Sequence, residues 1–373
     1  MAPSVHSAVV ITESSDVEVK KIPVPKAEEN EALIKVVAAA LNPTDWKSAK
    51  WMTKPGAVSG CDFAGIVEEL GPSAKASGLK VGNRVAAFAS GGGYDLKRQG
   101  NGSFAEYTVV PASFCIPLPD SWSFEQGAQI GVIIYTAFQT LYQSLNLPTP
   151  FSPGAPTSTP LLVYGASSAV GLYVVQIARA TGFQIFATCS PKNFELVKSL
   201  GADATFDYRD PEVSSKIKEA SGGKIQFAVD AISEGNSAKI IVDALSSEGG
   251  KIATVLPYSD EAKAALGSNV TQELSVAYDL IVDRPDAPSR LADAPKYCKL
   301  AARLLAEEKV KPMPIRIWEK GLEGVNDAMQ YMIAGKASLS KVLASPPPCA
   351  YVPALQVSGE KIVFRIPDTP GLS

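Results

Sequence analysis

Short apolar runs, bounded by glycine, proline and asparagine, fill the first part of the chain. Their length and their content of β-branched residues predict strands rather than helices. The spacing favours a small barrel or sandwich, because no helical pattern lies between the runs to link parallel strands. The predicted strands are Ala8–Ile11, Glu31–Val37, Gly65–Leu70, Val81–Phe88 and Phe104–Val110.

The pattern changes near residue 125, where breakers become rare and the stretch Phe124–Leu145 predicts a helix. The segment Leu147–Pro160 contains five prolines and predicts a surface loop. Beyond it, short buried strands alternate with helices, which implies a parallel, doubly wound sheet and an α/β fold. The expected strands are Leu161–Tyr164, Gln184–Thr188, Ala204–Phe206, Gln226–Asp230 and Lys251–Leu256, with helices at Val170–Thr181 and Asn193–Leu200.

The C-terminal part predicts a strand at Ile315–Trp318 and a helix at Leu322–Ala334. Two later segments, Ser340–Leu343 and Lys361–Ile366, both fit a final strand, and the Pro-rich stretch Ser345–Pro353 lies between them. Either the chain carries a surplus C-terminal strand, or an insertion splits one terminal element. The sequence leaves both interpretations open.

Composition excludes several classes of protein. The chain has 373 residues, and its net charge near −3 offers no basic surface to nucleic acid. No window reaches the length of an apolar membrane span, and the first residues lack a signal-peptide pattern, so we expect a cytoplasmic protein with no membrane partner. The single histidine, His6, lies in what reads as an N-terminal tail, which disfavours a Ser-His-Asp or Cys-His hydrolase. The five scattered cysteines contain no CxxC pair and predict reduced thiols rather than a zinc site: Cys61, Cys115, Cys189, Cys298 and Cys349.

The stretch Val163–Gly171 joins a buried strand to a helix through small residues alone. Such a turn lets backbone N–H groups and the positive end of a helix approach a pyrophosphate. Its composition is weak evidence, since Ser168 and Ala169 stand where glycines often lie, but its place between strand and helix supports a dinucleotide site. A tight turn in another kind of α/β protein stays open.

The residues that follow the predicted strand Gln184–Thr188 indicate whether the cofactor is NAD or NADPH. A site selective for NAD usually carries Asp or Glu there, whereas this chain has Ser190, Lys192 and Asn193 and no acid. A hydroxyl, an ammonium and an amide suit a 2′-phosphate, which a carboxylate would repel. We therefore expect NADPH, with a solvated surface lysine as the plain alternative for Lys192.

Four ordered motifs now identify a resemblance: Asn42-Pro43-Thr44-Asp45, Gly60-Cys61-Asp62-Phe63-Ala64-Gly65, Val81-Gly82-Asn83-Arg84-Val85 and Gly102-Ser103-Phe104-Ala105-Glu106-Tyr107. In this order, and followed by the nucleotide turn, they resemble the medium-chain dehydrogenase/reductase superfamily over residues 8–335. The resemblance implies a GroES-like β-rich catalytic domain, a Rossmann domain and a C-terminal return to the first domain. The corresponding boundaries are 1–128, 129–309 and 310–373.

Within that superfamily the chain is similar to the zinc-free quinone-reductase branch. Zinc alcohol dehydrogenases carry Cys and His near residues 42–47 and His-Glu near 61–62, where this chain has Asn-Pro-Thr-Asp-Trp-Lys and Cys-Asp. One thiol and one carboxylate do not complete a zinc site, so Cys61 is expected to be a packed core cysteine and no metal is predicted.

A closer likeness is to the fungal trans-acting enoyl reductases of polyketide synthesis. It rests on Asn42–Lys47, on the run Ala187–Phe194 and on Phe206-Asp207-Tyr208-Arg209. The resemblance places Thr44, Asp45, Trp46, Lys47 and Thr136 near the nicotinamide half, Leu256 and Pro257 beside its ring, and Ser190, Lys192, Asn193 and Tyr208 near the 2′-phosphate. The turn itself contributes Gly165, Ala166, Ser167, Ser168, Ala169 and Val170. Tyr208 as a sheet-edge aromatic and Thr136 as a helix-interior residue are the plain alternatives.

The resulting hypothesis is an NADPH-dependent reductase that transfers hydride to the β-carbon of an α,β-unsaturated carbonyl. Lys47 is the expected catalytic residue, stabilising the enolate or donating a proton; holding the cofactor ribose is an equally good role, and water is another proton donor. The apolar segment Ile130–Tyr135 suits either an acyl chain or a buried helix.

The expected partners are a small-molecule or carrier-bound enoyl substrate and, by docking, a polyketide synthase. The resemblance allows a monomer or a homodimer. A quinone oxidoreductase, a non-catalytic NADPH-binding protein and a disrupted reading frame that folds poorly stay open as alternatives.

Overall fold

The structure is a computed structural model that describes residues 2–52, 54–93, 100–152, 158–283, 288–334 and 360–372. Its contacts divide the chain into two compact units. The first comprises 1–132, 278–307 and 312–373, and the second comprises 133–277 and 308–311. These units keep 278–307 with the β-rich part, whereas the sequence-based boundaries at 128 and 309 assign it to the nucleotide-binding domain. The sequence-based boundaries stay a prediction.

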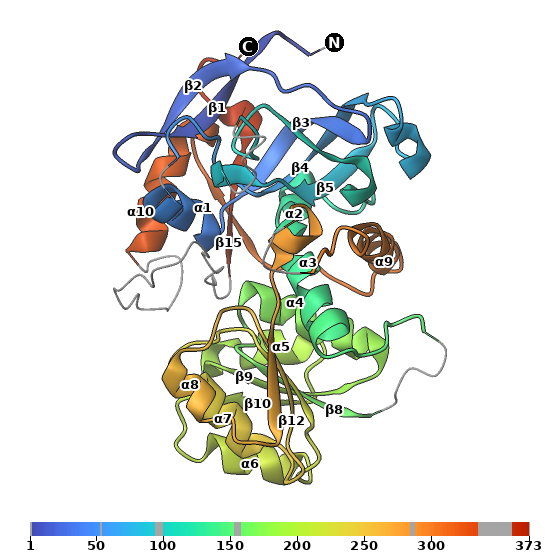
Figure 1. The fold of residues 1–373 in the computed structure, drawn as a ribbon, viewed down its shortest axis with the longest axis vertical. Coiled ribbons are helices and arrows are strands. Elements are labelled where there is room, and N and C mark those ends of the chain that lie inside the picture. The colour runs from blue at the N-terminus through green and yellow to red at the C-terminus, as the bar shows by residue number, and fades with distance from the viewer. Residues whose placement is uncertain are drawn as a thin grey trace. The chain divides into compact units, whose positions relative to one another are not determined.

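The first unit is built on a mostly antiparallel sheet (Figure 1). Its strand order is β14-β15-β3-β4-β5-β7, with β6 also paired to β3, and β1 and β2 form a separate two-stranded sheet. Alternation of buried and exposed positions is weak in β3 and β4, because both faces of these central strands are covered. The strands are β1 Val5–Ile11, β2 Val17–Pro23, β3 Glu31–Ala40, β4 Asp62–Leu70, β5 Arg84–Phe88, β6 Tyr107–Pro111, β7 Ile116–Pro117, β14 Ile315–Trp318 and β15 Lys361–Arg365.

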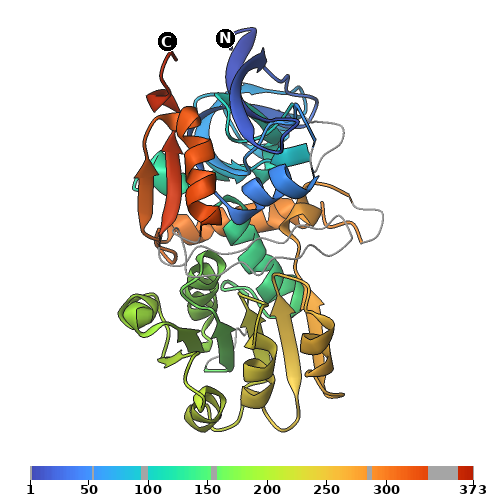
Figure 2. The same cartoon turned by 90° about the vertical axis from the view of Figure 1, so that its left-hand side faces the viewer.

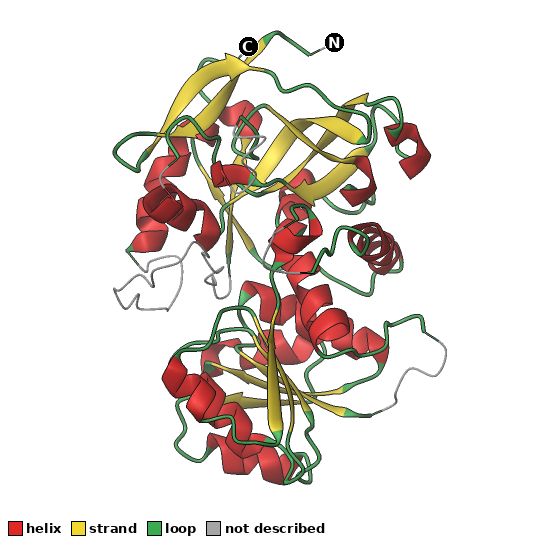
Figure 3. Cartoon of the chain, in the orientation of Figure 1, coloured by secondary structure: helices red, strands yellow, loops and turns green. Residues whose placement is uncertain are grey.

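The second unit is a six-stranded parallel sheet in the order β10-β9-β8-β11-β12-β13, which is the 3-2-1-4-5-6 order of a Rossmann fold. Figure 3 shows its strands in yellow with helices packed around them. The central strand β8 is buried from Leu161 to Tyr164, as a parallel sheet covered on both faces requires. The strands are β8 Pro160–Tyr164, β9 Gln184–Cys189, β10 Ala204–Asp207, β11 Phe227–Asp230, β12 Gly250–Thr254 and β13 Val270–Leu274.

The helices predicted over 170–181, 193–200 and 322–334 are present with slightly different limits, and several further helices were not predicted. Helix α4 begins at Ala169, where the Ser168 hydroxyl caps it, and ends at Gly182, whose φ of 104° only glycine adopts without strain. The α-helices are α1 Pro43–Lys47, α2 Phe124–Ala128, α3 Gly131–Phe138, α4 Ala169–Thr181, α5 Phe194–Ser199, α6 Val213–Ala220, α7 Ser237–Ala244, α8 Asp260–Ala264, α9 Ala294–Ala306 and α10 Val325–Ile333.

The single helix predicted over Phe124–Leu145 is wrong, because the chain breaks between α2 and α3 and then continues in a π-helix, Gln139–Ser144. Two buried tertiary contacts explain the break. The Gln129 side-chain amide exchanges two hydrogen bonds with the backbone of Met313, and the backbone N–H of Val132 donates to the Asp62 carboxylate at 2.6 Å. Asp62 therefore takes the place of a local cap at the start of α3.

The final strand of the described chain is β15, Lys361–Arg365, one of the two candidates from the sequence. It runs parallel to β14 and antiparallel to β3, and Figure 2 shows it in red beside β14. The other candidate, Ser340–Leu343, lies outside the described residues, as does the whole Pro-rich stretch Ser345–Pro353.

Candidate functional site

The nucleotide turn after β8 has the geometry that a dinucleotide phosphate needs. Gly165 has φ 74°, and a Cβ there would lie 2.4 Å from a side-chain carbon of Ile232. A Cβ on Gly171 would meet the Gly165 carbonyl oxygen, also at 2.4 Å, so helix α4 packs directly on the turn. This 13-residue helix begins beside Ser167, Ser168, Ala169 and Val170. The positive end of its dipole therefore lies where the backbone of the turn leaves room for a phosphate to come close.

The carboxyl end of β9 lies next to this turn, since the Gly165 N–H donates to the Thr188 hydroxyl at 3.1 Å and the Ala166 N–H to the Thr188 carbonyl at 2.8 Å. Ser190 and Asn193 follow Thr188 and are half-buried, and Lys192 is exposed. These side chains therefore share one edge of the sheet with the turn, as the sequence predicts.

Tyr208 follows the neighbouring strand β10 and lies edge-on to Tyr164, with their rings 6.4 Å apart. Asp207, the last residue of β10, precedes Tyr208, and Arg209 donates to both of its carboxylate oxygens. This ion pair holds the pKa of Asp207 below its usual value and offsets its negative charge. The residues of this corner and of the turn therefore fit a dinucleotide.

Three further expected residues lie in the second unit. Thr136 is in α3 and is buried, Leu256 is buried just after β12, and Pro257 beside it is exposed. The apolar segment Ile130–Tyr135 is buried throughout, as expected for either of its two interpretations. Their contact with a nicotinamide stays a prediction.

In the first unit, helix α1 carries Thr44, Asp45, Trp46 and Lys47, all at most 5% exposed. The Lys47 Nζ lies 5.7 Å from the centre of the Trp46 ring and 5.4 Å from that of Trp51, and the two indoles meet edge to face. Aromatic faces attract an ammonium ion, so the two indoles help to hold the Lys47 side chain in this position.

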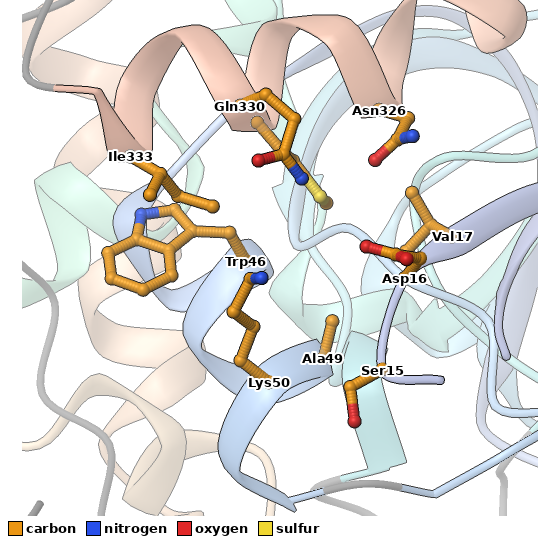
Figure 4. A pocket seen from close by; sticks show the side chains of 10 residues that line it. Ser15, Asp16, Val17, Trp46, Ala49, Lys50, Asn326, Gln330 and Ile333 are labelled. Atoms are coloured by element: carbon orange, nitrogen blue, oxygen red, sulfur yellow. The ribbon is translucent and has the colours of Figure 1, made fainter. Parts of the chain in front are cut away.

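A small pocket with a cavity volume of about 10 Å³, partly open to solvent, lies beside Trp46. Figure 4 shows it between α10, which carries Asn326, Gln330 and Ile333, and the segment that carries Trp46 and Lys50. Its volume is below the usual range for a small-molecule site, so we assign it no substrate.

A buried polar cluster behind α1 is the feature that sequence reasoning missed. Lys361, at the start of β15, is 1% exposed and donates to the Asn42 side-chain oxygen and, at 3.4 Å, to the Asp62 carboxylate. The Asn42 amide also donates to Asp62 at 2.9 Å. A lysine separated from Asp62 by 299 residues gives no local signal of this pairing.

Asp45 and Cys61 form the other half of this cluster. The Asp45 Oδ2 accepts from the Asn42 backbone N–H at 2.6 Å, and the Cys61 Sγ lies 2.8 Å from the Tyr278 hydroxyl. Burial raises the pKa of Asp45 to about 7, with the Cys61 thiol acting in the opposite direction, and burial also raises the pKa of Cys61. Cys61 is therefore buried as expected, but it is hydrogen-bonded rather than merely packed.

This cluster does not fit a zinc ion. It offers one thiol and no histidine, and the cation beside Asp62 is the Lys361 ammonium. No group of three or more His, Cys, Asp and Glu side chains in the described ranges could hold a metal.

The one histidine, His6, is not in a ragged tail as the sequence suggested. It lies in β1, is 1% exposed, and its Nδ1 accepts the Tyr107 backbone N–H at 3.1 Å. Burial lowers its pKa to about 4. The N-terminal residues are ordered because β1 pairs with β2. This pairing cannot be predicted from the first six residues alone.

The helices of the described chain include none with the length and apolar character of a membrane span. Two family models match the chain: the alcohol dehydrogenase GroES-like domain over residues 28–120 and the zinc-binding dehydrogenase domain over residues 169–290. Among solved structures, the enoyl reductase CurK superposes with a TM-score of 0.72 at 16% identity, covering 96% of this chain and 98% of its own, which is a likeness of fold.

Curated relatives match at higher identity. A trans-enoyl reductase of Alternaria alternata is 37% identical over 340 residues, 90% of this chain and 97% of its own length. A second trans-enoyl reductase, from Pyricularia oryzae, is 34% identical over 356 residues, 91% of this chain and 98% of its own length. The chain belongs to the trans-enoyl reductase family within the medium-chain dehydrogenase/reductase superfamily and is an enoyl-reductase-like oxidoreductase.

Proposed function

We propose that the protein reduces the α,β double bond of an enoyl thioester, with NADPH as the hydride source and without zinc. The observation that carries the reaction is the match to trans-enoyl reductases over nearly their whole length. When bound, the reduced nicotinamide supplies the hydride to the β-carbon of the substrate. The protein binds and orients both molecules, stabilises the negative charge on the thioester oxygen and moves a proton.

The preference for NADPH is supported by the corner formed by Ser190, Lys192, Asn193 and Tyr208 beside the turn at Gly165. A 2′-phosphate there meets an ammonium, a hydroxyl and an amide, and the nearby Asp207 is neutralised by Arg209. NADH would leave these donors without their acceptor.

Lys47 is the proposed group for the developing enolate. Lys47 is buried and its ammonium lies beside two indole rings, and a charge held away from water stabilises an oxyanion more strongly than one in solution. Thr44, Asp45 and Trp46 share its helix and hold its backbone in place.

Zinc-independence is supported by Lys361, whose ammonium provides a positive charge between Asn42 and Asp62. The substrate is proposed to arrive on the carrier domain of a polyketide synthase, in the manner that the relatives' name implies. The protein acts as a monomer or a homodimer in the cytoplasm.

Stopped-flow measurement of NADPH oxidation tests this function. Crotonyl and hexenoyl thioesters are compared with a quinone and with no acceptor, each with NADPH and with NADH, after treatment with EDTA. We expect rapid oxidation with the thioesters and NADPH, unchanged by the chelator. Oxidation by the quinone alone would make the protein a quinone reductase, and cofactor binding without oxidation would make it a non-catalytic binding protein.

A further inference from the structure

Reduction of an enoyl thioester needs a proton at the α-carbon after the hydride has reached the β-carbon. The inference below rests on the proposed function and concerns where that proton comes from. Four buried side chains of the first unit carry exchangeable protons. Two side-chain contacts join Thr44, Tyr278 and Cys61, and the Asp45 carboxyl is the next group that acts on Cys61.

The contacts in this chain are short enough for proton transfer. The Thr44 Oγ1 lies 3.2 Å from the Tyr278 hydroxyl, and that hydroxyl lies 2.8 Å from the Cys61 Sγ. In both contacts either atom can be the donor, which is the condition for a proton to pass along the chain. The Cys61 thiol acts as a hydrogen-bond donor to the Asp45 carboxyl and lowers its pKa, against the larger effect of burial.

Asp45 has the character of a proton reservoir. Asp45 is 2% exposed. Of its two carboxylate oxygens, Oδ2 accepts a hydrogen bond from the Asn42 backbone N–H, whereas Oδ1 has no hydrogen-bond partner among the described residues. A carboxylate oxygen left without a donor in a buried site favours the protonated acid. Burial has the largest effect on the pKa of Asp45 and raises it. The Cys61 thiol and the Asn42 backbone N–H lower this pKa, Asp62 raises it and Lys361 lowers it.

We propose that Thr44, Tyr278, Cys61 and Asp45 form a buried proton relay that protonates the α-carbon of the substrate. The electron pair of the enolate double bond forms a C–H bond with the Thr44 hydroxyl proton, and the thioester carbonyl re-forms. Thr44 takes the proton of Tyr278, Tyr278 that of Cys61, and Cys61 that of Asp45. Asp45 ends as a carboxylate, and water entering after product release returns its proton by the same route.

The relay predicts which variants fail and how. Thr44→Val breaks its substrate end, Tyr278→Phe its middle, and Asp45→Asn removes the reservoir while keeping an acceptor for the Asn42 N–H. The matched controls are Thr108→Val and Tyr107→Phe, whose side chains are equally buried in the same unit but lie outside the chain. Thr44→Ser keeps the hydroxyl and is expected to retain activity.

Reduction of crotonyl thioester by NADPH in D₂O gives a readout that a structural role would not move, namely the configuration of deuterium at the α-carbon. Wild type and both controls are expected to give one configuration. The three relay variants are expected to react at least about tenfold more slowly and to give a mixture, because water then protonates either face.

The pH profile supplies the second readout. Because the donor is the protonated acid, and burial raises the pKa of Asp45 to about 7, the wild-type rate is expected to fall as pH rises above about 7. That fall is expected to disappear in Asp45→Asn. Wild-type profiles and a single configuration in Asp45→Asn and Tyr278→Phe would overturn the relay alone. Absence of NADPH oxidation by the wild-type protein would instead overturn the proposed function.

Discussion

Replacement of Lys361 by methionine is the sharpest test of the buried cluster. The ammonium and the Asp62 carboxylate are 3.4 Å apart and almost fully buried, so an effective dielectric constant of about 20 gives an attraction of about 5 kcal/mol. Removal of one partner from a buried pair leaves the other charge without compensation, at a cost of about 3–5 kcal/mol. We expect Lys361→Met to lower the free energy of unfolding of the first unit by that amount.

The loss is expected to depend on pH in a defined direction. Burial raises the pKa of Asp62 and Lys361 opposes that rise, so Lys361→Met raises it further. A carboxyl whose pKa is higher in the folded than in the unfolded state stabilises the folded state less as pH rises. The difference between wild type and Lys361→Met should therefore be largest near neutral pH and shrink as pH falls toward about 4, the pKa of an unfolded Asp.

Urea unfolding followed by tryptophan fluorescence measures this loss in the correct unit, because all four tryptophans, Trp46, Trp51, Trp122 and Trp318, lie in the first unit. Asp62→Asn added to Lys361→Met removes the stranded charge and should recover most of the stability. Lys20→Met, at an exposed lysine, serves as the control. A Lys361→Met variant within about 1 kcal/mol of wild type, with no pH dependence, would refute the reasoning.

Three further predictions concern the cofactor and the reaction. Lys192→Ala should weaken NADPH binding about tenfold, measured by fluorescence titration, and leave NADH binding unchanged; Lys198→Ala, another exposed lysine nearby, should change neither. Gly165→Ala should abolish NADPH binding and lower the free energy of unfolding by about 1–3 kcal/mol, because the φ of Gly165 is positive and Ile232 blocks a Cβ. The control Gly223→Ala, at a glycine with positive φ but open space around it, should retain NADPH binding. Lys47→Ala should lower turnover of an enoyl thioester at least about 100-fold, with Lys50→Ala near wild type; equal rates for both would remove Lys47 from the reaction.

The sequence predicted those parts of the fold whose signals are local. The strand Leu161–Tyr164, the small-residue turn and the helix that begins at Ala169 follow each other within twenty residues, and all three are present. The break between α2 and α3 was missed, because it depends on Asp62 and Met313, which are distant in the sequence.

The same reason limits what was predicted of the site. Thr44–Lys47 and Ser190–Asn193 were identified from their motifs. The structure places the first group in α1, where the sequence predicted no helix, and Pro191–Asn193 in a short 3₁₀ helix after β9. Lys361 and Tyr278 join Asn42, Asp45, Cys61 and Asp62 only through tertiary packing, and neither carries a motif. The pairing of Lys361 with Asp62, which stands where zinc-dependent members of the superfamily carry a metal ligand, can be recognised only once β15 is known to pair with β3.

The most direct test of the central claim is the product of one turnover. The purified protein is mixed with crotonyl thioester and stoichiometric NADPH in the presence of EDTA, and the acyl product is identified by mass spectrometry. The proposed function predicts one equivalent of butyryl thioester for each NADPH oxidised. Unchanged crotonyl thioester, with NADPH intact or consumed only by a quinone, would contradict it.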